Sequence, residues 1–194
     1  MSKRMYLRRL AAAALLPAVG FLLSLSAQAG GESRPEQRLR QLKLELPRVT
    51  QPKNTLVNAV RVGSLLYVSG TGPTRPDGTQ VVGRLGKDLD VAQGKEAARL
   101  VGLNVLAVVR AELGSLDRVG RVVKTLGMVN ATPEFTQHPQ VINGFSDLMV
   151  EVFGAANGKG ARSAVGMASL PGGIPVEVEV IFELDPIQPA DKGK

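Results

Sequence analysis

Two charged side chains in the C-terminal third of the chain have the type and setting to do chemistry. Arg162 follows the glycine-rich loop 158–160 at the start of a β-rich segment. A guanidinium beside such a loop can bind a carboxylate through two parallel hydrogen bonds, although a surface ion pair explains most isolated arginines. Glu177 alternates with apolar residues, as do Glu179 and Glu183. This pattern is typical of a solvated strand face; the alternative is a subunit interface at which one glutamate and Arg162 orient a water molecule.

Few other chemistries are available to this composition. The chain has no Cys and one His, which excludes a thiol nucleophile, a disulfide framework, an iron–sulfur cluster and a structural zinc site. That histidine, His138, precedes Pro139 at the start of a predicted helix and has no Asp or Ser arranged around it, which favours a capping or surface role. The sequence Gly70-Thr71-Gly72 lacks the third glycine of a nucleotide-binding loop and indicates a strand that ends in a turn.

The first 29 residues have the layout of a secretory signal. Basic residues within 3–9 precede an apolar run at 10–25, and residues 27–29 (AQA) supply the small–x–small pattern of a cleavage site. The apolar run is shorter than the ~20 residues of a membrane-spanning helix, although an uncleaved anchor is the alternative. The sequence therefore predicts cleavage after Ala29 and a periplasmic mature protein, exported by the general secretory or the twin-arginine route.

The positive charge is concentrated in that signal. The whole chain has a formal charge of +7, and removal of the signal's four cations leaves 20 basic against 17 acidic residues. The remaining sequence has no basic run interleaved with aromatic residues, so we expect no nucleic-acid partner. The composition predicts a flexible tether or short frayed helix at 30–45, one domain at 46–184 and a C-terminal tail at 185–194.

The elements that must position Arg162 and Glu177 are read from the alternation of β-rich and helical patterns. We expect strands at 59–62, 65–69, 119–129, 163–168 and 176–183, with a short edge strand at 81–82. We expect helices from an Asp90 cap to Leu113, and from Val141 to Phe153 with Gly154 ending the second. This order predicts an α+β fold in which two helices cover one face of a mixed sheet.

The ordered set of motifs resembles the RidA/YjgF family. Residues 161–166 (ARSAVG), Leu170-Pro171 and 176–179 (VEVE) are similar to its C-terminal signature P-x-R-S-x-V, L-P and V/I-E-I/V-E, with Gly160 in place of the proline. The resemblance extends over essentially all of 46–184. Its other parts are the second strand (LLYVSG, 65–70), the first helix with the turn after it (100–104, 116–119) and the second-helix asparagine (VIN, 141–143).

This resemblance implies a chorismate-mutase-like α+β subunit that forms a homotrimer with ligand sites in the clefts between subunits. The family's archetypal activity is deamination of reactive enamine and imine acids, such as 2-aminoacrylate and 2-iminobutanoate, to the 2-keto acid and ammonia. It uses no metal or organic cofactor. A non-catalytic trimeric protein that binds small carboxylates is the main alternative. An endoribonuclease, the activity in the family's older name, and a chaperone-like protein are less favoured.

The resemblance also implies roles for individual residues. Arg162 would bind the substrate carboxylate, Glu177 would position or deprotonate the attacking water, and the backbone of Ala164 would lie near the reacting carbon. The remaining pocket residues would be Ser69, Gly70, Asn143 and Leu56. Leu56 stands where the family has a tyrosine, which removes a polar wall, and Ala164 stands where the family often has a cysteine.

Overall fold

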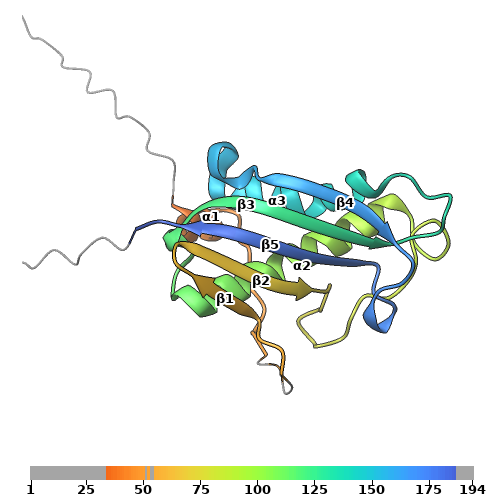
Figure 1. Ribbon diagram of the computed structural model, residues 1–194, viewed down its shortest axis with the longest axis horizontal. Helices are drawn as coiled ribbons and strands as arrows, with labels where there is room; N and C mark the ends of the chain where they lie inside the picture. The colour runs from red at the N-terminus through yellow and green to blue at the C-terminus, as the bar shows by residue number, and fades with distance from the viewer. Residues whose placement is uncertain (1–33, 51, 53–54, 187–194) are drawn as a thin grey trace, which may run out of the picture. The chain divides into compact units, whose positions relative to one another are not determined.

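A mixed five-stranded sheet forms the centre of the computed structural model, which describes residues 34–50, 52 and 55–186 (Figure 1). The strand order is β1-β2-β5-β3-β4, and only the β3–β4 pair is parallel. The predicted α+β fold with a mixed sheet is therefore confirmed. The strands are β1 (Ala59–Val62), β2 (Leu65–Thr71), β3 (Val119–Asn130), β4 (Ala161–Met167) and β5 (Val176–Leu184). The predicted signal segment and residues 187–194 of the predicted tail lie outside the described residues.

Two long helices, α2 (Val91–Leu113) and α3 (His138–Gly158), cover one face of the sheet. The start of α2 is as predicted: the Asp90 carboxylate accepts from the backbone N–H of Gln93, whose side chain accepts in return from the N–H of Asp90. Gly144 of α3 lies against the backbone carbonyl oxygen of Lys95 in α2. A β-carbon at position 144 would overlap that oxygen, so the glycine allows the two helices to approach closely.

The opposite face of the sheet is left open. On β5, the apolar side chains of alternate residues are almost fully buried beneath the helices: Val176, Val178, Val180 and Phe182. The other alternate residues of β5, which are Glu177, Glu179, Ile181 and Glu183, lie on the open face. The predicted placement of these glutamates on one side of the strand is therefore confirmed.

Some predicted bounds were wrong. Residues 81–82 form no strand, and the nearby chain has only isolated bridges, such as those between Thr74 and Gln80 and between Leu85 and Ala131. Gly154 interrupts the helical run with a φ of 80°, as predicted, but one more turn follows it, so α3 extends to Gly158. Strand β4 begins at residue 161 instead of 163.

The segment expected to be a tether contains the helix α1 (Pro35–Gln41), which is attached to the domain. Leu39 is only 3% exposed. The backbone N–H of Glu36 donates to the Asp117 carboxylate at 3.0 Å, and the Glu36 carboxylate accepts from the N–H of Leu116 at 3.0 Å. A short helix, the second alternative for this segment, is therefore present, and it is packed against the rest of the domain instead of forming a flexible tether. Within the described ranges, no helix is long and apolar enough to cross a membrane.

Candidate functional site

The guanidinium of Arg162 is anchored to the helix that covers its strand. Its Nη1 donates to the Asn143 side-chain oxygen at 2.8 Å and to the Ser146 hydroxyl oxygen at 3.1 Å. Asn143 and Ser146 are three residues apart on α3, so their side chains lie on the same side of the helix. Sequence analysis predicted Asn143 and missed Ser146, although this i, i+3 spacing is a signal that points to it.

This anchoring leaves one edge of the guanidinium open to a ligand. Within the part of the chain that the structure describes, Nε and Nη2 of Arg162 make no hydrogen bond. These two nitrogens form the edge that can bind the two oxygens of a carboxylate in parallel. Arg162 is thus a cation of fixed orientation with its carboxylate-binding edge available.

A hollow of about 150 Å³ lies next to Arg162, between α3 and the loop that leads into β4. Its lining includes Ser146, Lys159 and Gly160. The glycine-rich loop therefore lies beside the arginine, as its position in the sequence indicated. The hollow is smaller than the ~300–1,000 Å³ of typical ligand pockets.

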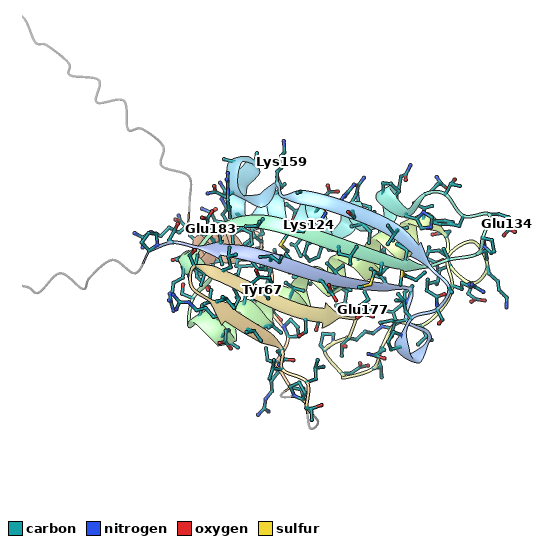
Figure 2. All side chains as sticks on the ribbon, in the orientation of Figure 1. Tyr67, Lys124, Glu134, Lys159, Glu177 and Glu183 are labelled. Atoms are coloured by element: carbon teal, nitrogen blue, oxygen red, sulfur yellow. The ribbon has the colours of Figure 1, made fainter. Side chains whose placement is uncertain are left out.

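Glu177 forms a second group of predicted residues at the end of β2 (Figure 2). A β-carbon at Gly70 would overlap the Glu177 carboxylate, so the glycine makes room for it. The hydroxyl of Ser69 donates to the carbonyl oxygen of Val57 at 2.7 Å. That bond holds the segment next to Leu56 beside β2, and the Leu56 side chain is 53% exposed. The structure thus brings Ser69, Gly70 and Glu177 together, with Leu56 nearby.

The environment of Glu177 favours the protonated form of its side chain. Burial raises the pKa of the Glu177 carboxyl above its ordinary value of 4.5, and the negative charge of Glu179 raises it further. A carboxylate whose pKa is raised holds a proton more strongly. Glu177 therefore has the character of a general base that accepts a proton from water.

In a single copy, Arg162 and Glu177 lie on opposite faces of the sheet. Arg162 pairs with Thr125 of β3, which pairs with buried Val180 of β5, so all three lie on the face that the helices cover. Glu177 pairs with Met128 of β3 on the open face. Strands β4 and β5 are also separated by β3, which places their backbones roughly 9–10 Å apart. One copy therefore cannot present both side chains to one small ligand.

The other predicted residues divide between these two groups. Ala164 lies two residues after Arg162 on β4 and pairs with Gly127, so it shares the helix-covered face with Arg162 and Asn143. Ser69 and Gly70 belong with Glu177. Among the residues that the structure describes, no group of three or more His, Asp or Glu side chains is placed to hold a metal ion.

Comparison with known proteins identifies the family. Residues 36–172 match the family described as "YjgF/chorismate_mutase-like, putative endoribonuclease". The chain belongs to this family. This membership confirms the resemblance to the RidA/YjgF family, and the matched residues include the motif around Arg162. Protein TCP17 of Trypanosoma cruzi is 43% identical to the chain over 152 residues, which cover 78% of this chain and 95% of that protein.

Solved structures of similar proteins share the fold. Protein Atu1372 of Agrobacterium tumefaciens, described as having unknown function, is 42% identical with a TM-score of 0.70, covering 78% of this chain and 92% of that one. A protein of Shewanella oneidensis described as a "putative endoribonuclease" is 31% identical with a TM-score of 0.74, covering 78% of this chain and all of that one. These similarities support the chorismate-mutase-like fold. The reaction must be inferred from the residues of the site.

The raised pKa of the Glu177 carboxyl can be measured directly. We expect carboxyl-carbon NMR titration to give Glu177 a pKa above 4.5. The substitution Glu179→Gln should lower this pKa because it removes a repelling charge, yet leave it above 4.5 because burial is the larger cause. The matched substitution Glu183→Gln, further along the same strand face, should leave it unchanged. A wild-type value at or below 4.5, or equal effects of the two substitutions, would contradict this description of the site.

Proposed function

We propose that the protein hydrolyses reactive imine acids of the 2-iminobutanoate type, and 2-aminoacrylate after its tautomerisation to the imine, to 2-keto acids and ammonia. The observation that carries the proposal is the guanidinium of Arg162, which is held at Nη1 while Nε and Nη2 face no protein partner among the described residues. This arrangement suits a planar carboxylate. The resemblance to the RidA/YjgF family, whose archetypal activity is deamination of such acids, implies the same substrate class.

In the proposed reaction, Arg162 fixes the substrate carboxylate and thereby places the imine carbon beside Ala164. Strand β4 lies at an edge of the sheet, so backbone groups on its outer side are available to hydrogen-bond near that carbon. Glu177 accepts a proton from a water molecule as the water oxygen bonds to the imine carbon and the π electrons pass to nitrogen. Glu177 then gives this proton to the nitrogen, which completes the carbinolamine. The hydroxyl proton of the carbinolamine passes to the nitrogen as the C–N bond breaks, so the hydroxyl becomes the keto oxygen and ammonia leaves. Orientation of water and substrate supplies most of the rate, because such imines hydrolyse readily by themselves.

The proposed active site needs two copies of the chain, with Arg162 and Ala164 from one and Ser69, Gly70 and Glu177 from the next. The separation of these groups on two sheet faces supports this arrangement. So do apolar side chains on the open face that are 37–49% exposed, since association buries such surface: Val60, Tyr67, Val165 and Met167. A head-to-tail contact that closes after three copies forms a homotrimer with three equivalent sites.

The exposed side chain of Leu56 favours a second candidate function. It replaces a polar pocket wall with an apolar one, so fewer groups are available to hold the attacking water. In that case the same Arg162 clamp binds small carboxylates without turnover. An endoribonuclease that uses a pair of histidines is not proposed, because the chain contains a single His.

An assay of keto-acid release from 2-aminoacrylate generated in situ tests the proposed function. We expect the wild-type protein to accelerate release, and Arg162→Ala to lower kcat/KM by about 10- to 100-fold through loss of a charged hydrogen-bonding partner. Arg40→Ala, which removes an exposed arginine of α1, is the matched control and should retain wild-type kcat/KM. Equal rates for wild type and Arg162→Ala contradict the proposal. Arg162-dependent binding without any acceleration supports the carboxylate-binding alternative.

We infer further that the protein is exported to the periplasm, on the basis of its N-terminal sequence. Basic residues, an apolar run and the AQA pattern at 27–29 occur in the order of a signal peptide. On expression of the full chain in a bacterium, intact-mass analysis of the periplasmic fraction should give a protein that begins at Gly30. Recovery of the full-length chain from the cytoplasmic fraction would contradict export.

A further inference from the structure

The only histidine of the sequence lies beside the strand that carries Arg162. His138 is the first residue of α3, and its ring packs edge-on against Phe135 with the ring centroids 5.3 Å apart. Its Nε2 lies over Gly166 of β4, where a β-carbon would come within 2.6 Å of that nitrogen. The cap position of α3 is Gln137. His138 is half-buried against β4 and is neither the predicted cap nor a fully exposed surface residue.

The strand places His138 in line with the proposed substrate site. Arg162, Ala164 and Gly166 are alternate residues of β4, so all three lie on the helix-covered face. Alternate residues of a strand are about 7 Å apart, so Gly166 lies about 13 Å from Arg162 along β4. A ligand that extends from Arg162 along β4 past Ala164 would bring its far end to Gly166 and His138.

The order of residues along α3 places His138 on the Gly166 side of the residues that hold Arg162. Asn143 and Ser146 hold the guanidinium of Arg162, and His138 lies five residues before Asn143. Along the helix axis, His138 is about 7.5 Å from Asn143 and about 12 Å from Ser146. The terminal oxygens of an extended four- or five-carbon dicarboxylate are about 6–7 Å apart, and a hydrogen bond of about 2.8 Å at each end extends its reach to about 12 Å.

The imidazole of His138 also has unused hydrogen-bonding capacity. Within residues 34–50, 52 and 55–186, neither of its ring nitrogens makes a hydrogen bond. A neutral imidazole presents one N–H donor and one acceptor nitrogen. The α3 dipole also places partial positive charge at its first turn, which favours a negatively charged oxygen next to His138.

We propose that His138 is a specificity-determining residue of the Arg162 site, which hydrogen-bonds the distal carboxylate of a four- or five-carbon dicarboxylic 2-imino acid. The inference rests on the proposed function, since it takes the carboxylate clamp of Arg162 as given and names the class of side chain that the substrate carries. Gly166 belongs to the same subsite, because a larger residue there would displace the imidazole. The backbone of Gly166 lies outside the left-handed region, so alanine can replace it without backbone strain.

Calorimetric binding of two stable keto acids tests this inference on the intact protein. The probes are 2-oxoglutarate, which has a distal carboxylate, and 2-oxobutanoate, which does not. We expect wild type to bind 2-oxoglutarate about tenfold more tightly, as one hydrogen bond to a charged group allows. His138→Phe, which keeps the ring, and Gly166→Ala should abolish the preference while leaving 2-oxobutanoate affinity unchanged. His138→Gln should retain part of the preference, and the exposed Gln140→Ala, in the same turn of α3, should retain all of it.

The outcomes separate this inference from the proposed function. The role of His138 is overturned if wild type does not prefer 2-oxoglutarate. It is also overturned if the preference survives in His138→Phe and Gly166→Ala. In both cases Arg162-dependent binding of the two acids would still support the proposed function. If Arg162→Ala binds both acids as tightly as wild type, the proposed function fails and the role of His138 fails with it.

Discussion

Successive side chains of a β-strand point to opposite faces of the sheet, and the arrangement of this site depends on that constraint. Arg162 and Glu177 are fixed in register through β3, the first opposite Thr125 and the second opposite Met128. The helices bury the face on which Arg162 lies and leave that of Glu177 open. In the proposed reaction, the clamp for a carboxylate and the base for water therefore belong to different surfaces of one molecule. That proposal requires a second copy to bring them together and links activity to assembly.

On each face of the sheet, a close contact positions the charged group that lies there. On the helix side, α3 holds Arg162 through Asn143 and Ser146, so the guanidinium loses little conformational entropy when it binds an anion. On the open side, Gly70 provides the space that the Glu177 carboxylate occupies, and partial burial there raises the pKa of that carboxyl. The histidine at the start of α3 lies over Gly166, on the same strand face as Arg162, where we propose that it binds the far end of the substrate.

Sequence periodicity was sufficient for the features that depend on residues near one another in the chain. The alternation of valine and glutamate in β5 correctly oriented Glu177, and the Asp90 cap correctly marked the start of α2. Contacts between distant segments could not be read in this way. The burial of Leu39 in α1 and the position of His138 over Gly166 depend on packing between segments that are distant in the chain, which no local pattern encodes. The family resemblance supplied the pairing of Arg162 with Glu177, whereas the anchoring by Ser146 emerged only from the structure.

Co-expression of Arg162→Ala and Glu177→Gln chains tests the two-copy site most directly. Each variant alone lacks one important group at every site and should be at least about tenfold less active than wild type in the deaminase assay. Random mixing in a ring restores about a quarter of the sites, because each site takes its arginine from one copy and its glutamate from the next. We therefore expect about a quarter of wild-type activity from the mixture, measured per site. A mixture no more active than the average of the two separate variants would contradict an active site shared between copies.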